Sequence, residues 1–242
     1  MFEKYLISQE IREIKGEKMI YFLDTANLEQ IKYCNEFYPI SGVTTNPTII
    51  SKENTDFWKL VKGIRAVIGD DKLLMVQTVQ TEASKIIEEA KLLKAELGYN
   101  FVVKIPMCEE GLKATMALKA LGIRVLITTI FTPPQALIAA NAGASYVAPY
   151  VNRIDNIIGD GCEVAAQIVD QFEHYNLDCK VLAASFKNAD QVHKCAVNGC
   201  HAATVTPDIL KSLITHPMTS ECLRKFDSDW SGIYEDKTIL DF

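Results

Sequence analysis

The chain has 242 residues, 48% of them hydrophobic and 23% charged, and carries a formal net charge of −6. It has no long block of lysine or arginine, which argues against a nucleic-acid or anionic-membrane surface but not against small anionic substrates, because a pocket needs only a few local cations. No apolar run reaches the ~18 residues that a membrane-spanning helix requires, and residues 1–18 alternate apolar and charged residues, unlike a secretion signal.

From residue 19 onward, short apolar runs rich in β-branched residues alternate with segments of helical period, and the alternation repeats eight times. In residues 82–98, for example, apolar side chains recur three and four positions apart and polar residues fill the other face. Eight strand-then-helix units predict an α/β fold, a closed parallel (β/α)8 barrel of the TIM type. The predicted strands are residues 20–26, 42–46, 73–79, 101–106, 125–131, 146–152, 180–186 and 202–206.

An open, doubly wound sheet is the alternative arrangement of parallel strands. Such a sheet usually has fewer strands and a glycine fingerprint after the first of them. Here the first run is followed by residues 24–27, whose short polar side chains predict a helix cap and leave no phosphate cradle. The turn at 159–161 lacks the third glycine of the fingerprint and is interpreted as a loop. The barrel is therefore favoured.

No linker divides residues 19–230, which predicts one domain. Two additional C-terminal helices are expected, the first over 206–215 after Thr206-Pro207 and the second over 219–229, opened by Thr219. Residues 1–18 form an amphipathic leader to which no function is assigned. We thus divide the chain into a leader, 1–18, and a barrel domain, 19–242.

Polar residues stand at the ends of the predicted strands. The carboxyl ends of barrel strands share one face, where active sites lie. Core strands have little reason to bury hydrogen-bonding groups unless these face a common wet cavity. The candidate site residues are Asp24, Thr45, Asn46, Gln77, Lys104, Thr128, Thr129, Tyr150, Asn152, Arg153, Ser185 and Thr204.

Lys104 is the candidate nucleophile. It lies within the run 101–106, among β-branched residues and shortly before Pro106, so a barrel strand would keep its side chain from bulk water. Desolvation disfavours the ammonium form, lowers the pKa and frees the amine to form a Schiff base with a carbonyl. The alternative is an outward-facing lysine that reaches solvent. The polar residues at the other strand ends favour the chemical interpretation.

Several neighbouring candidates have an equally good structural interpretation. Asp24 and Asn46 suit the orientation of an amine and of substrate hydroxyls, but also a helix cap and a turn before proline. Tyr150 suits core packing, or proton transfer directly or through a water held by Gln77 and Thr128.

Arg153 and Ser185 are the candidate phosphate ligands. The guanidinium offers a charged fork and the serine a hydroxyl, with Lys187 nearby in sequence. For Arg153 the alternative is a salt bridge with Asp155 or another carboxylate at the rim.

Metal chemistry is not favoured. His193, Cys195, Cys200 and His201 fit no standard zinc spacing and fall on the opposite face of the predicted barrel. No histidine stands at a predicted strand end, so we expect neither a metal nor another cofactor. The seven cysteines are odd in number, scattered and without a C-x-x-C pair, which is typical of reduced, cytoplasmic proteins.

Six blocks occur in a characteristic order: Asp24-Thr25, GVTTNPTII (42–50), VVKIP (102–106), EEGLKA (109–114), APYVNRID (148–155) and LAASFK (182–187). Together they resemble the small transaldolase family, and most closely its fructose-6-phosphate aldolase branch, over residues 19–235. The resemblance implies that Lys104 is the Schiff-base lysine, that Asp24 and Asn46 assist its reaction, and that Arg153 with Ser185 takes the phosphate.

Gln77 and Tyr150 bear on which branch the chain resembles. The resemblance implies that Gln77 and Thr128 hold a catalytic water and that Tyr150 is the acid/base. Transaldolases of this family carry glutamate in place of Gln77 and phenylalanine in place of Tyr150, so both positions are of aldolase type. Residues 129–132 instead resemble the transaldolase version of that strand end.

The expected activity is that of a class I aldolase, which reversibly cleaves fructose 6-phosphate to dihydroxyacetone and glyceraldehyde 3-phosphate. The first alternative is a transaldolase that moves the dihydroxyacetone unit between sugar phosphates, as in the pentose phosphate pathway. Both activities cleave the C3–C4 bond through the same enamine and differ in whether a proton or an aldose captures it. The alternative of another class is a sugar-phosphate-binding protein without catalysis.

The resemblance also implies a homo-oligomer, a pentamer or a decamer, in which the C-terminal helix reaches a neighbouring copy. An isolated barrel would leave part of residues 219–242 exposed. We therefore expect this segment to make oligomer contacts through its apolar side chains, among them Leu223, Phe226, Trp230, Ile233 and Tyr234.

Overall fold

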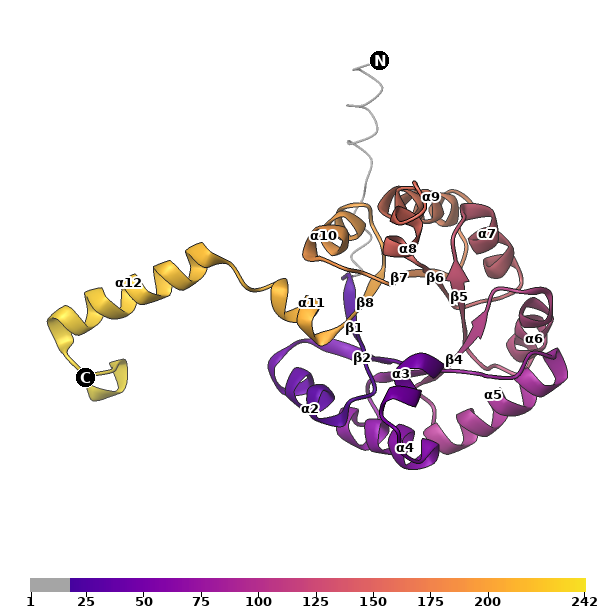
Figure 1. Ribbon diagram of the computed structural model, residues 1–242, viewed down its shortest axis with the longest axis horizontal. Helices are drawn as coiled ribbons and strands as arrows, with labels where there is room; N and C mark the ends of the chain where they lie inside the picture. The colour runs from indigo at the N-terminus through magenta and orange to yellow at the C-terminus, as the bar shows by residue number, and fades with distance from the viewer. Residues whose placement is uncertain (1–17) are drawn as a thin grey trace, which may run out of the picture.

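The computed structural model describes residues 18–242 and contains a closed barrel of parallel strands joined by helices (Figure 1). The predicted leader lies outside the described residues except for its last position. The strands follow one another around the barrel in chain order, from β1 to β8, and β8 pairs with β1. The prediction of a (β/α)8 barrel is therefore confirmed. The strands are β1 Ile20–Asp24, β2 Ile40–Thr44, β3 Leu73–Gln77, β4 Phe101–Pro106, β5 Val125–Ile130, β6 Tyr146–Pro149, β7 Lys180–Ala183 and β8 Ala202–Val205.

Helices surround the barrel, and most of them start at a short polar side chain. Asn27 accepts a hydrogen bond from the Gln30 backbone N–H at the start of α2, and Asp160 accepts one from Glu163 at the start of α9. Such caps satisfy N–H groups that have no partner within the helix. The helices are α2 Leu28–Phe37, α3 Pro47–Lys52, α4 Phe57–Ile68, α5 Ala83–Leu97, α6 Glu109–Ala120, α7 Pro133–Asn141, α8 Val151–Asp155, α9 Gly161–His174, α10 Ala189–Val197, α11 Pro207–Ser212, α12 Pro217–Tyr234 and the 3₁₀ helix η1 Ile239–Asp241.

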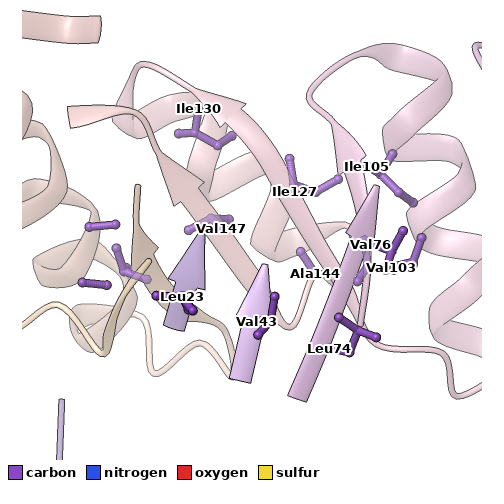
Figure 2. Close-up of a cluster of buried hydrophobic side chains, with 14 of the residues drawn as sticks. Leu23, Val43, Leu74, Val76, Val103, Ile105, Ile127, Ile130, Ala144 and Val147 are labelled. Carbon is purple, nitrogen blue, oxygen red and sulfur yellow. The ribbon is translucent and has the colours of Figure 1, made fainter. Parts of the chain in front are cut away.

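Two apolar layers hold the barrel, because alternate residues of a strand face opposite sides of the sheet. Residues such as Leu74, Val103 and Ile127 face the helices and belong to the larger core (Figure 2). The smaller core fills the barrel interior with Phe22, Met75, Val102, Leu126, Tyr146, Ala148, Leu182, Ala184 and Ala202. This alternation sets which residue at each strand end points into the barrel.

Two glycines allow close approaches between neighbouring segments of the backbone. A Cβ on Gly42 would lie 2.0 Å from the Leu73 carbonyl oxygen, so only glycine lets β2 lie this close to β3. A Cβ on Gly161 would lie 2.2 Å from the Val151 carbonyl oxygen, so glycine at the start of α9 lets this helix pack against α8.

The C-terminal helices differ from the prediction in their bounds. Helix α12 starts at Pro217, and its cap is His216, whose Nδ1 accepts a hydrogen bond from the Met218 N–H. The expectation that Thr219 opens this helix is therefore wrong, because a proline in the first turn together with a capping side chain before it already starts the helix. Helix α12 extends away from the barrel (Figure 1), and none of its residues is buried. Within residues 18–242, no helix has both the length and the apolar character needed to cross a membrane.

Candidate functional site

A cavity of about 110 Å³ opens at the carboxyl ends of the strands. Its position agrees with the face on which barrel enzymes place their active sites. The walls combine polar side chains from the strand ends with apolar residues of the barrel interior. The lining residues are Asp24, Thr44, Asn46, Lys104, Leu126, Thr128, Ala148, Tyr150, Arg153, Leu182, Ala184, Ser185 and Thr204.

Lys104 projects from β4 into this cavity and is only 5% exposed. Its Nζ donates a hydrogen bond to the Thr45 carbonyl oxygen at 2.7 Å. Burial lowers the pKa of Lys104 below its ordinary value, and the nearby charge of Asp24 partly opposes this effect. The amine is thus held by a neutral acceptor in a buried position, which shifts its protonation equilibrium toward the uncharged, nucleophilic form.

Asp24, the last residue of β1, carries the carboxylate of the cavity. Its Oδ1 accepts a hydrogen bond from the Thr44 hydroxyl at 2.7 Å, and the Thr44 and Thr204 hydroxyl oxygens are 2.5 Å apart. Asp24 does not cap the helix that follows, since Asn27 does so. The alternative of a helix cap is therefore wrong for Asp24, whose carboxylate borders the cavity.

Tyr150 stands next to Thr128 on the wall formed by β5 and β6. The two hydroxyl oxygens are 2.9 Å apart. The ring of Tyr150 meets the edge of Phe131, with 5.6 Å between centroids, and lies 4.9 Å from the guanidinium carbon of Arg153. These contacts fix the phenol in place while its oxygen faces the cavity.

Arg153 and Ser185 border the same cavity from α8 and from the loop after β7. The proposed salt bridge between Arg153 and Asp155 is absent from the described residues, because Asp155 instead accepts from the Gly161 N–H and from the Gln191 side chain. Ser185 has a φ of +63°, a left-handed conformation that costs a non-glycine residue roughly 1 kcal/mol.

Asn46 caps a helix and also borders the cavity. Its Oδ1 accepts from the Ile49 N–H at 2.9 Å and thereby caps α3, yet the residue also lines the cavity. The cap fixes the amide orientation, so its NH₂ group is the part that can donate to a ligand.

Other predicted residues lie beside the cavity rather than in its wall. The Thr45 hydroxyl donates to the Met75 carbonyl oxygen, and only its backbone oxygen contacts Lys104. Gln77 ends β3 directly opposite Lys104 in the strand register, but it is not a lining residue. The Thr129 hydroxyl donates to the Thr128 carbonyl oxygen, and the Asn152 side chain accepts from Gln191.

The polar lining residue that we did not predict from the sequence is Thr44. Its signal lies in the strand register, because Asp24 and Thr44 are partners on adjacent strands and share a face. Thr204 was among the polar strand ends, but no role was assigned to it.

The candidate metal cluster does not assemble. Within the described part of the chain, no group of three histidine, cysteine or acidic side chains has an arrangement that could hold a metal ion. Cys195 and Cys200 are buried, and the His201 Nδ1 accepts a hydrogen bond from the Val181 N–H. These side chains therefore take part in packing and hydrogen bonding within the fold.

The chain is similar to several known proteins. A family model described as "Transaldolase/Fructose-6-phosphate aldolase" matches residues 21–238. "Probable transaldolase 1" of Bacillus cereus is 40% identical over 217 residues, covering 90% of this chain and 100% of that protein. "Probable transaldolase" of Aquifex aeolicus is 42% identical over 217 residues, covering 90% of this chain and 99% of that protein. A solved structure described as "Native KDPGal structure" shares the fold, with a TM-score of 0.56, 16% identity, and coverage of 80% of this chain and 84% of that one.

Proposed function

Because the chain belongs to the transaldolase/fructose-6-phosphate aldolase family and is therefore an enzyme of aldolase or transaldolase type, we propose that it is a Schiff-base aldolase. In this proposal it reversibly cleaves fructose 6-phosphate to dihydroxyacetone and glyceraldehyde 3-phosphate and needs no cofactor. The observation that carries the proposal is a buried lysine facing the same cavity as a tyrosine hydroxyl, itself 2.9 Å from the Thr128 hydroxyl.

The reaction begins at Lys104. Its uncharged Nζ attacks the C2 carbonyl carbon of the ketose, and loss of water from the resulting carbinolamine gives an iminium ion. The Asp24 carboxylate stabilises this positive charge and orients the substrate hydroxyls. Asn46 also orients the substrate hydroxyls, through its free amide NH₂ group. Burial of the lysine supports this role, since a fully solvated lysine amine would be protonated and unreactive at neutral pH.

Tyr150 then performs the proton transfers. Its oxygen takes the proton from the C4 hydroxyl and passes its own proton to a water held by Thr128 and Gln77 as the C3–C4 bond breaks, which releases glyceraldehyde 3-phosphate and leaves an enamine on Lys104. Return of a proton to C3, directly or through this water, gives the iminium of dihydroxyacetone, which water hydrolyses. The hydrogen bond to Thr128 supports the assignment, because it orients the phenolic oxygen.

The phosphate is placed on Arg153 and Ser185. Both residues line the cavity, and the guanidinium is free of Asp155 and can form two parallel hydrogen bonds to phosphate oxygens. A single local cation suffices for this purpose even though the net charge of the chain is −6.

A transaldolase is the second candidate, and the names of the relatives, "Probable transaldolase 1" and "Probable transaldolase", favour it. Such an enzyme would pass the enamine to an aldose acceptor instead of protonating it. The deciding experiment measures consumption of fructose 6-phosphate with and without erythrose 4-phosphate. Consumption without the acceptor supports the aldolase, whereas an absolute need for the acceptor supports the transaldolase.

A trapping experiment tests the step that both candidates share. The protein is incubated with dihydroxyacetone or fructose 6-phosphate and sodium borohydride, and the adduct is located by peptide mass spectrometry. The proposal requires a reduced adduct on Lys104 and none in a Lys104→Met variant. An unmodified Lys104 in a sample that turns over substrate would contradict it.

We also propose that residues 219–242 join copies of the chain into a homo-oligomer in the cytoplasm. Helix α12 supports this, because its apolar side chains are exposed, for example Leu223 at 62% and Phe226 at 63%. Light scattering should give a mass of several chains, and a Leu223→Asp, Phe226→Asp double variant should reduce it. A monomeric wild-type protein would contradict the proposal.

A further inference from the structure

A chain of hydroxyl groups lies beneath the carboxylate of the cavity. The Thr44 hydroxyl is 2.7 Å from Asp24 Oδ1, and the Thr204 hydroxyl is 2.5 Å from that of Thr44. Thr44 is 0% and Thr204 3% exposed, so bulk water does not compete for these bonds. The three side chains come from β1, β2 and β8, which are neighbours in the barrel.

The direction of the hydrogen bonds follows from chemistry. An ionised carboxylate can only accept, so the Thr44 hydroxyl must donate its single proton to Asp24. The Thr44 oxygen is then left to accept, and the proton between the two threonines must come from Thr204. Hydrogen bonds aligned in one direction polarise and strengthen one another in a buried site.

The position of Thr204 is unusual for the barrel interior. In the strand register it pairs with Phe22 rather than with Asp24, so it lies one inward-facing step below the carboxylate. Its counterparts in the inner core are apolar, among them Met75 and Val102. A buried hydroxyl among apolar side chains costs free energy unless it is hydrogen-bonded. Thr204 is hydrogen-bonded to Thr44, which in turn donates to Asp24.

We propose that Thr204 is a positioning residue, which orients Thr44 and thereby holds the Asp24 carboxylate in place for reaction at Lys104. The proposal rests on the proposed Schiff-base function. Among the described residues, no hydrogen bond uses Asp24 Oδ2, so the chain anchors one oxygen and leaves the other for the substrate or the developing iminium. Thr204 acts through Thr44.

The test compares Thr204→Val, which removes the hydroxyl, with Thr204→Ser, which keeps it. The readout is the initial rate of borohydride-trapped adduct formation on Lys104 with dihydroxyacetone. Thr204→Val should slow this rate about tenfold, the upper end of the effect of one hydrogen bond between neutral groups, and Thr204→Ser should restore most of it. The matched control is Thr115→Val in α6. It removes another buried hydrogen bond of a threonine, which Thr115 Oγ1 donates to the Gly111 carbonyl oxygen at 2.8 Å, and it should leave the rate unchanged.

A double-mutant cycle separates positioning from packing. Thr44→Val breaks the chain at its middle, so adding Thr204→Val to it should cause almost no further loss of rate. The KM for fructose 6-phosphate should change less than kcat in Thr204→Val, since Arg153 and Ser185 are untouched. A wild-type adduct rate in Thr204→Val, equal losses in the serine and valine variants, or additive losses in the double variant would overturn the proposal. Absence of any adduct in the wild-type protein would instead refute the proposed function itself.

Discussion

Replacing Tyr150 with phenylalanine removes one oxygen and leaves the ring contacts in place. The edge contact with Phe131 and the guanidinium of Arg153 over the ring do not involve the hydroxyl. What is lost is the 2.9 Å hydrogen bond to Thr128, whose side chain is fully buried. Such a loss, including the hydroxyl left without its partner, costs about 1–2 kcal/mol of unfolding free energy. For a chain of this length that lowers Tm by about 2–8 °C.

The effect on catalysis should be much larger. If Tyr150 transfers the proton, its removal should slow cleavage of fructose 6-phosphate by about 10²–10⁴-fold, equivalent to about 3–5 kcal/mol of transition-state stabilisation. Thermal unfolding of the same variant separates this fall from a loss of folded protein. Trapping of dihydroxyacetone on Lys104 should persist, since the amine and Asp24 are unchanged.

The assay combines steady-state cleavage, borohydride trapping and thermal unfolding of the same samples. Tyr99→Phe is the matched control, because Tyr99 is 82% exposed and outside the cavity, and it should match the wild type in all three measurements. Cleavage by Tyr150→Phe within threefold of the wild-type rate would refute the proton-transfer role. Loss of trapping together with cleavage would show that the site had collapsed.

Three further predictions concern single residues of the site. Because burial lowers the pKa of Lys104, the unfolded chain binds the proton of this amine more tightly than the folded chain. Unfolding free energy should therefore rise with pH between the lowered pKa and the ordinary lysine value. In denaturant titrations at several pH values, Lys104→Met should show a smaller rise of unfolding free energy over this pH range. An equal rise in the variant and the wild type would contradict this. Arg153→Lys should raise KM for fructose 6-phosphate about tenfold or more, because the planar fork is lost, with little change for unphosphorylated fructose; equal effects on both sugars would exclude phosphate binding there. At Ser185, with a φ of +63°, the glycine variant should be about 1 kcal/mol more stable to denaturant than the alanine variant, and the reverse order would refute the strain.

The fold and the burial of Lys104 were predictable because their signals are redundant. Eight strand-then-helix units leave few arrangements other than a barrel. Lys104 has β-branched neighbours on both sides, so its burial does not depend on the exact residues at which the predicted strand begins and ends. The sequence does not show which of Thr44 and Thr45 faces the interior of the barrel. The predicted run 42–46 ends two residues after the observed strand Ile40–Thr44, so the predicted strand end fell on Thr45 and Asn46 instead of Thr44. Only the pairing with β1 shows that Thr44 faces the interior.

Other features depended on contacts that a linear pattern does not contain. The sequence suited Asn46 equally to a turn before Pro47 and to the site, and in the fold the residue that caps α3 also borders the cavity. The alternative of a salt bridge for Arg153 was excluded by Gln191, which lies far along the chain and occupies Asp155. The start of α12 was misplaced because His216 was not considered as a capping residue.

The packed interior of the barrel also constrains the order of events in catalysis. Phe22, Met75, Val102 and Leu126 are fully buried beneath the cavity, so molecules pass only through its mouth at the carboxyl face. The aldehyde fragment released from a ketose must leave by the path that the next molecule uses to enter. Any acceptor therefore finds the enamine only after the first product has gone. A transfer reaction in this site would follow double-displacement kinetics, with parallel lines in double-reciprocal plots.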